Sequence, residues 1–123
     1  MLNFKNFSVQ KRIEEIVPGV FVAADYALAN IILISRNRKW FFIDSTESCK
    51  VMEEILDDFE KMLGKPKAIS GLIMTHFHTD HSYGSGAILE YAKSLGQSSI
   101  PVYTHEKFTQ GKGYFFRFLV GQK

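Results

Sequence analysis

The chain has 123 residues, of which 46% are hydrophobic and 14% aromatic, so it can build a hydrophobic core and is not a disordered chain. This length predicts one domain at most. Fifteen basic residues stand against thirteen acidic ones, and a net charge of +2 gives no reason to expect a nucleic-acid or membrane partner.

Cysteine content and hydropathy bear on the compartment. Cys49 is the only cysteine, which excludes an intrachain disulfide and gives no sign of an oxidising environment. The N-terminal residues lack the apolar core of a signal peptide, and no stretch approaches membrane-spanning length. We therefore expect a soluble, cytoplasmic protein.

The N-terminal residues 1–17 are expected to form an arm or short helix that precedes a domain of residues 18–123. Val9, Ile13, Ile16 and Val17 have helix-like spacing, yet an extended arm fits the same residues. Pro18 and Gly19 then predict a turn.

Three apolar runs follow at short spacing, and we expect them to form antiparallel strands. They are Val20–Ala23, Asn30–Ile34 and Trp40–Ile43, with a polar hairpin tip over residues 36–39.

An amphipathic helix is predicted next. Ser45 and Thr46 offer capping hydroxyls at its start, whereas Gly64 and Pro66 end it. Its apolar residues share one stripe, which we interpret as a face packed on a sheet rather than a partner-binding surface. They are Val51, Met52, Ile55, Leu56, Phe59, Met62 and Leu63.

A strand over Ala68–Met74 precedes a second helix, which is predicted to begin at residues 84–86 and to close at Gly96. Pro101–Thr104 forms a further strand. Strand, helix and strand in this order imply a parallel crossover, so the chain is predicted to be an α/β protein with a mixed sheet.

The segment Thr75–His81 carries four ligand-type side chains within six consecutive positions: His76, His78, Asp80 and His81. Imidazole and carboxylate groups are good zinc ligands. Side chains two apart on an extended chain share a face, so the histidine pair can hold one metal and Asp80 with His81 a second. A lone histidine would mean little, but this cluster predicts a metal site.

The pattern T-H-x-H-x-D-H after an apolar strand resembles the signature of the metallo-β-lactamase superfamily, a group of metal-dependent hydrolases. The order of elements over about residues 17–109 is similar to the first half of that fold, a four-layer αββα sandwich. The resemblance implies two Zn²⁺ ions, one at His76 and His78 and one at Asp80 and His81. It also makes Asp80 catalytic, because this carboxylate orients the water whose hydroxide attacks an ester-type substrate.

Two further residues have candidate supporting roles. Asp44 resembles the family's carboxylate that supports a ligand histidine, although it could instead cap the helix predicted at Ser45. His105 ends a strand, where it is expected to be a solvated or second-layer histidine rather than a ligand.

Two segments bear on the substrate. Residues 20–31, with Tyr26, Leu28, Ala29 and Asn30, resemble the alkyl sulfatase branch of the superfamily, and residues 102–108 look similar to it. The leading small-molecule substrate is therefore an alkyl or aryl sulfate ester. Thioesters, β-lactams and nucleic-acid phosphodiesters remain alternatives.

The chain is shorter than the proteins that it resembles, because their fold normally has about twice this size. Residues 18–123 would then form a truncated metallo-β-lactamase-like domain that lacks the remaining ligands. It is either an incomplete catalytic domain or a non-catalytic half-domain that binds metal or a partner. The apolar run of residues 114–120 predicts self-association through the C-terminal segment.

Overall fold

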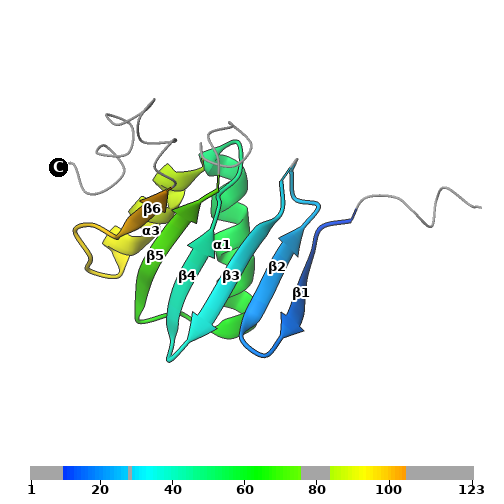
Figure 1. The fold of residues 1–123 in the computed structure, drawn as a ribbon, viewed down its shortest axis with the longest axis horizontal. Helices are drawn as coiled ribbons and strands as arrows, with labels where there is room; N and C mark the ends of the chain where they lie inside the picture. Colours follow the sequence, from blue (N-terminus) through cyan, green and yellow to red (C-terminus); the bar gives the residue numbers. More distant parts are fainter. Residues whose placement is uncertain (1–9, 28, 76–83, 105–123) are drawn as a thin grey trace, which may run out of the picture.

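The computed structural model describes residues 10–27, 29–75 and 84–104. Within them, six strands form one sheet in chain order, and two helices cover one of its faces (Figure 1). The elements are β1 (Arg12–Val17), β2 (Val20–Ala24), β3 (Ile31–Arg36), β4 (Lys39–Ile43), α1 (Cys49–Leu63), β5 (Ala68–Met74), α3 (Ser85–Ser94) and β6 (Val102–Thr104). The predicted α/β class with a mixed sheet is confirmed.

The sheet is antiparallel in its first half and parallel in its second. Strands β1 to β4 pair antiparallel through short turns, whereas β5 and β6 follow α1 and α3 and pair parallel. Asn37 and Arg38, with φ of 55° and 61°, make the two-residue turn of the β3–β4 hairpin. Both the antiparallel run and the parallel crossover agree with the sequence prediction.

The N-terminal residues differ from one of the two predictions. Arg12–Val17 is a strand that pairs with β2 across the turn at Gly19, so a helix over these residues is wrong and the extended alternative holds. A helix this short is marginal by itself, while pairing with β2 satisfies the backbone groups on the side of the segment that faces β2. The predicted boundary between the N-terminal residues 1–17 and the domain of residues 18–123 therefore lies inside the β1–β2 hairpin.

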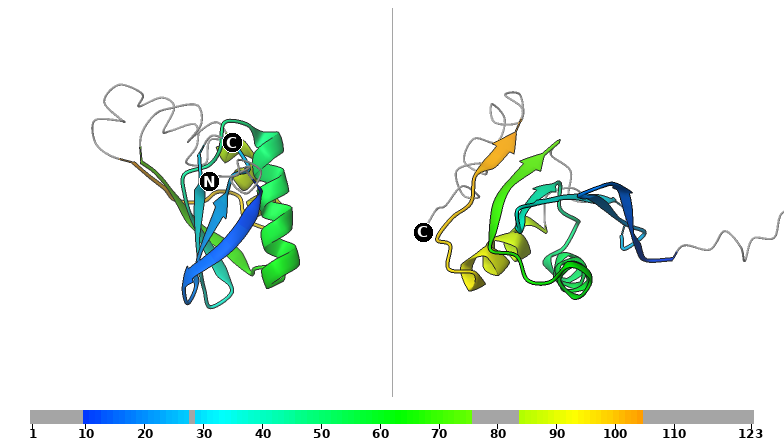
Figure 2. Two further views of the ribbon diagram at one scale, coloured as in Figure 1. Left: turned by 90° about the vertical axis from the view of Figure 1, so that its right-hand side faces the viewer. Right: turned by 90° about the horizontal axis from the view of Figure 1, so that it is seen from below.

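The hydrophobic core lies between the sheet and the two helices, which both sit on the same side of it (Figure 2). The ring of Phe59 contacts those of Trp40 and Phe42 edge-on, with centroids 6.0 and 6.4 Å apart. The apolar stripe of α1 packs as predicted up to Phe59. Its last two residues do not, because Met62 is 51% and Leu63 36% exposed.

The start of α1 also differs from the prediction. Ser48, rather than Ser45 or Thr46, is the N-cap, and its Oγ accepts a hydrogen bond of 3.2 Å from the N–H of Val51. Thr46 instead donates its hydroxyl to the carbonyl of Ser48 at 2.9 Å. Residues 44–48 thus form a loop between β4 and α1, referred to below as the β4–α1 loop. The predicted end at Gly64 is confirmed, with φ of 86°.

Two tyrosines fix α1 to its neighbours. The hydroxyl of Tyr26 donates to Asp58 at 2.7 Å, and that of Tyr91 in α3 donates to Glu60 at 2.6 Å. Burial raises the pKa of both tyrosines, and the hydrogen bond to a carboxylate raises it further. In the part of the chain described, neither helix has the length and apolar content needed to cross a membrane.

Candidate metal centre

The carboxyl ends of three parallel strands meet at one edge of the sheet. Strands β4, β5 and β6 run in the same direction, with Ile43 beside Ile73 and Met74 beside Thr104. The next residues along the chain are Asp44 and Thr75, which the structure places. Ligand sites of open α/β sheets lie outside this edge, where loops leave the strand ends.

Asp44 holds Thr75 at this edge. Its carboxylate, in a residue only 6% exposed, accepts a 2.8 Å hydrogen bond from the backbone N–H of Thr75. The hydroxyl of Thr75 lies 2.8 Å from Oδ2 and 3.0 Å from Oδ1, so it also donates to this carboxylate. The N–H of Asp44 donates to the carbonyl of Ile73 at 2.7 Å. The last residue before the histidine motif is therefore fixed on the neighbouring strand.

The backbone of Asp44 itself is unusual. Its φ of 66° lies in the left-handed region, which non-glycine residues adopt rarely and which Asp tolerates better than most. Such conformations persist where the surrounding contacts hold them, and they are common at functional sites. Here the bonds to Thr75 and Ile73 hold the turn.

The far side of the motif is held by the same β4–α1 loop. The N–H of Gly84 donates to the carbonyl of Thr46 at 2.6 Å. A Cβ at Gly84 would lie only 3.0 Å from the backbone N and Oγ1 of Thr46 and from the carbonyl oxygen of Ser48. A glycine lets the two backbones approach this closely. Thr75 and Gly84, which flank residues 76–83 in the sequence, therefore both contact the β4–α1 loop.

The predicted ligands His76, His78, Asp80 and His81, together with His105, lie outside the described residues. Among the residues that are described, no group of three or more His, Cys, Asp or Glu could hold a metal ion. The convergence of the four side chains therefore stays a prediction. Three imidazoles and a carboxylate are a ligand set that suits zinc.

Two residues of this frame were not assigned a role by sequence reasoning. Thr75 was part of the motif, and Gly84 was taken only as the start of a helix. The available signal was their position, because Thr75 directly precedes the first histidine and Gly84 comes three residues after His81. The capping alternative for Asp44 is not what the structure shows, since Ser48 caps α1 and the carboxylate of Asp44 bonds Thr75.

A groove of about 370 Å³ lies elsewhere, between α1 and α3. Its described lining includes Glu53, Asp57, Glu90 and Tyr91, all of them from the helices. It is a surface feature of the helical layer, separate from the strand ends that frame the motif.

Residues 25–96, more than half of the chain, match the sequence profile of the Metallo-beta-lactamase superfamily, and the chain belongs to this family. Its fold corresponds to the first half of the family's αββα sandwich. No curated protein sequence matches the chain.

Several solved structures share the fold. The sec-alkylsulfatase Pisa1 from Pseudomonas sp. is 22% identical with a TM-score of 0.60, over 63% of this chain and 12% of that one. A metallo-β-lactamase from Hirschia baltica is 21% identical with a TM-score of 0.63, over 92% of this chain and 50% of that one. The mono-zinc form of the metallo-β-lactamase FIM-1 from Pseudomonas aeruginosa is 17% identical with a TM-score of 0.62, over 94% of this chain and 50% of that one. The chain thus spans half or less of the length of these proteins.

Proposed function

We propose that the chain carries the first metal-binding half of a zinc-dependent hydrolase. The observation that supports this most strongly is the double attachment of residues 76–83. Asp44 holds Thr75 at one end, and Thr46 holds Gly84 at the other. The two residues that flank four ligand-type side chains in the sequence are thereby fixed near the carboxyl ends of parallel strands, an edge where ligand sites form.

Each residue has a distinct part in this proposal. His76 and His78 bind one zinc ion, and Asp80 and His81 bind a second, while Asp80 also orients the attacking water. Bound zinc supplies Lewis-acid polarisation and lowers the pKa of a bound water. Asp44 positions the first ligand through Thr75, and supports of this kind commonly tune metal affinity.

An alkyl or aryl sulfate ester is the proposed substrate. The resemblance of residues 20–31 and 102–108 to the alkyl sulfatase branch supports it, as does the shared fold with a sec-alkylsulfatase. The β-lactam hydrolases with the same fold make an ester-like amide the second candidate.

A non-catalytic role is favoured by one observation, the coverage of at most half of the similar chains. A catalytic zinc usually has three protein ligands, and the motif offers two for each ion. In this second candidate the chain binds metal weakly and hydrolyses nothing.

Zinc binding and hydrolysis separate the two candidates. The purified chain is loaded with Zn²⁺, passed through a desalting column and analysed by mass spectrometry for metal content, and its hydrolysis of 4-nitrophenyl sulfate and a secondary alkyl sulfate is followed. The hydrolase proposal expects two zinc ions per chain and turnover. Turnover and one of the two zinc ions are lost in His78→Ala and in Asp80→Asn. Turnover and both ions are kept in Glu53→Gln, an exposed position on α1. Zinc below one ion per chain without turnover would contradict it and favour the half-domain.

A further inference from the structure

Strand β1 is one of the two end strands of the sheet, since the strand order runs from β1 to β6. One side of β1 pairs with β2, and no element within the described ranges 10–27, 29–75 and 84–104 pairs with its other side. The backbone N–H and C=O groups on that outer side can therefore pair with a strand of another chain. Residues 11–15 along this outer side are referred to below as the edge segment.

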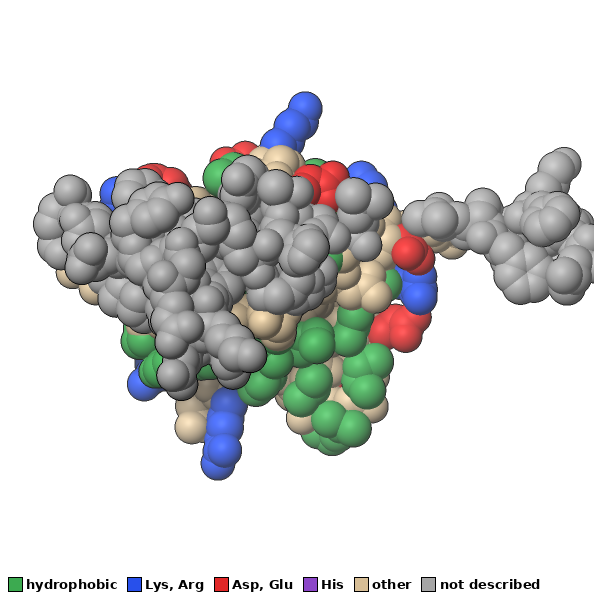
Figure 3. Space-filling model, turned by 45° about the horizontal axis from the view of Figure 1, so that its top comes forward, with side chains coloured by type: hydrophobic (Ala, Val, Ile, Leu, Met, Phe, Trp, Pro, Cys, Tyr) green, Lys and Arg blue, Asp and Glu red, His purple; other side chains and the backbone are tan. Residues whose placement is uncertain are grey.

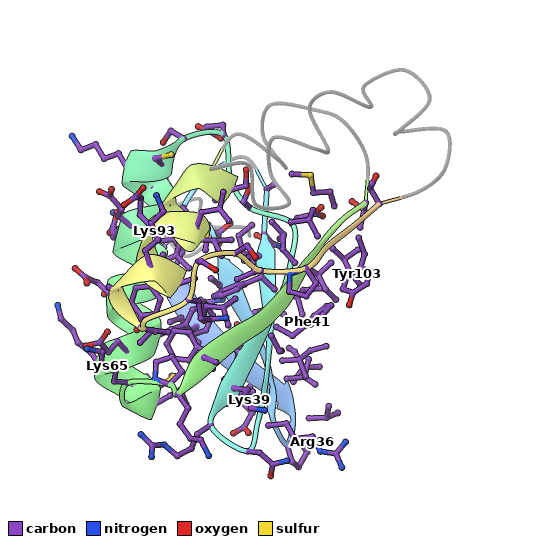
Figure 4. All side chains as sticks on the ribbon, turned by 90° about the vertical axis from the view of Figure 1, so that its left-hand side faces the viewer. Arg36, Lys39, Phe41, Lys65, Lys93 and Tyr103 are labelled. Carbon is purple, nitrogen blue, oxygen red and sulfur yellow. The ribbon has the colours of Figure 1, made fainter. Side chains whose placement is uncertain are left out.

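The opposite end of the sheet offers a shorter edge. Strand β6 has only three residues, and the side chain of Tyr103 at its middle projects away from the helices (Figure 4). Three residues offer few backbone groups to a partner strand, and short end strands are one way in which proteins prevent edge pairing. With six residues, β1 has the length of an ordinary strand, so it is the described edge that suits a partner.

Charged side chains of both signs lie along the edge segment, where Lys11 and Arg12 precede Ile13 and Glu14 and Glu15 follow it. In the space-filling view, acidic and basic side chains gather together along the right-hand edge of the molecule, where β1 lies (Figure 3). Charges on an end strand commonly oppose edge pairing, and like charges directly opposite each other destabilise a strand pair. The effect of these charges therefore depends on the register of the pair.

The edge segment has two faces, which limit the possible registers. Lys11, Ile13 and Glu15 are on the face with the helices, since Lys11 bonds a carboxylate of α1 at 2.6 Å and Ile13 packs against the core. Arg12 and Glu14 are on the other face, where they form an ion pair. Directly opposite residues of an antiparallel pair share a face. Two copies with their helices on the same side therefore place odd-numbered residues opposite odd-numbered ones.

One register of this kind places every charge opposite a charge of the other sign. With Ile13 of one copy facing Ile13 of the other, Arg12 lies opposite Glu14, and Lys11 lies opposite Glu15. A shift by two residues in either direction instead places Arg12 opposite Arg12 or Glu14 opposite Glu14. Because opposite charges across strands stabilise a pair and like charges destabilise it, the edge segment selects this register. Since the segment is complementary to itself, it also selects a second copy as its partner.

We propose that two copies of this chain form an antiparallel dimer through their edge segments, with a two-fold axis beside Ile13. The two six-stranded sheets then form one continuous sheet. A two-fold axis repeats each contact, so the dimer contains two Arg12–Glu14 pairs and two Lys11–Glu15 pairs. Because the contact joins two single strands, it is smaller than a standard interface, and the dimer is weak and depends on concentration.

Contacts within the chain prepare the edge segment for this pairing. Arg12 forms ion pairs with Glu14 and with Asp25, which directly follows β2. These contacts already restrict the Arg12 side chain in the monomer, so less conformational entropy is lost on association. A guanidinium group has five N–H donors, so Arg12 can keep these contacts and bind a further carboxylate. The bulge that interrupts β1 lies beyond Glu15, and it leaves the edge segment regular.

The test is the mass of the full chain in solution, measured by light scattering between about 20 and 500 µM, with a chelator present so that zinc has no part. The wild-type mass is expected to rise with concentration from 14.1 kDa toward twice that value. Arg12→Glu and Glu14→Arg each place like charges opposite each other, and each should weaken the dimer at least about tenfold. Lys93→Glu reverses one charge of an exposed ion pair on α3 and should leave the dimer intact.

An equimolar mixture of these two edge variants is the decisive measurement. In a mixed dimer, the new glutamate of Arg12→Glu faces the new arginine of Glu14→Arg, and the unchanged Glu14 of the first chain faces the unchanged Arg12 of the second. All charges are complementary again, so the mixture is expected to dimerise about as tightly as the wild type. A loss of stability in either chain cannot produce this rescue, because mixing alters neither chain by itself.

A second pair of charges keeps the proposal falsifiable if Arg12→Glu does not fold. Lys11→Glu and Glu15→Lys should each weaken the dimer, and their mixture should restore it, for the same reason. The proposal is overturned by a wild-type chain that is monomeric at about 500 µM, by a dimer indifferent to all four edge variants, or by mixtures in which no mixed dimer forms. A dimer that only Phe115→Lys/Phe118→Lys disrupts places self-association in the C-terminal segment and also overturns the proposal.

Discussion

The carboxylate of Asp44 and the backbone N–H of Thr75, 31 residues apart in the chain, are 2.8 Å apart in the structure. Each residue directly follows one of two neighbouring parallel strands, and the bond joins these strand ends. Since Thr75 precedes His76, the bond fixes the point from which the predicted ligand segment departs. Asp44 can therefore act on a metal through the backbone that carries the ligands.

Asp44→Asn is expected to weaken zinc binding about 10- to 100-fold, the range found when supporting partners of ligands are changed. The amide keeps one oxygen for the N–H of Thr75 but loses the charge and the second acceptor for its hydroxyl. Competition with a chromophoric chelator measures the affinity.

Asp58→Asn is the matched control for this change. It removes the charge of the carboxylate that accepts from the Tyr26 hydroxyl on the helical side and should leave zinc affinity as in the wild type. Equal affinity in Asp44→Asn and wild type would show that Asp44 has only a structural part.

Gly84→Ala is expected to destabilise the fold by about 1–3 kcal/mol, because the new Cβ meets backbone atoms of Thr46 and Ser48 that cannot move independently. It should also weaken zinc binding, since the segment loses its second held end. Urea unfolding and the chelator assay measure the two effects.

Gly86→Ala provides the comparison. Its Cβ would meet the Sγ of Cys49 at 3.1 Å, a side-chain atom that can shift, and alanine favours the helix. Its stability should stay within about 1 kcal/mol of the wild type. A Gly84→Ala chain as stable as Gly86→Ala would contradict the close approach.

The sequence could predict those features of the structure that depend on residues close together in the chain. β5 was expected over Ala68–Met74 and has those bounds, because an apolar run between a helix end and a polar motif has few alternatives. The start of α1 was misplaced because Ser45, Thr46 and Ser48 can all cap a helix. Thr46 instead bonds Ser48 and Gly84, and Gly84 is distant in sequence.

The same contrast between local and distant causes applies to the candidate site. Ligand types and their spacing could be read from residues 76–81 alone. The frame around them could not, because it depends on β4 and β5 being neighbours. The same limit left β1 undecided, since its spacing fits both a helix and a strand until its pairing with β2 is known.

Phe59→Ala is expected to cost about 3–5 kcal/mol in the free energy of unfolding. Phe59 is fully buried and its ring contacts those of Phe21, Trp40 and Phe42, so its loss leaves a cavity under the sheet. Met62→Ala, one turn further along α1 at a 51% exposed residue, should change stability by less than about 0.5 kcal/mol. Denaturant titration followed by the fluorescence of Trp40, the single tryptophan, measures both.

Stability should fall at alkaline pH because of Tyr26 and Tyr91. Their pKa values are raised in the folded chain above the ordinary value of 10.0, first by burial and then by hydrogen bonds to Asp58 and Glu60. As pH rises through about 10, the unfolded chain loses these protons while the folded chain keeps them, so deprotonation favours unfolding. The stabilising contribution is complete below pH 10 and is lost progressively above it.

Urea unfolding at a fixed protein concentration between pH 7 and 10.5 measures this dependence. The double variant Tyr26→Phe/Tyr91→Phe is expected to be less stable at pH 7, because two hydrogen bonds are missing, yet to lose stability less steeply above pH 9.5. Tyr103→Phe, at the exposed tyrosine on the other face, should keep the wild-type slope. If stability falls with pH as steeply in the double variant as in the wild type, other groups cause the loss of stability at alkaline pH. The pKa values of Tyr26 and Tyr91 are then not the cause.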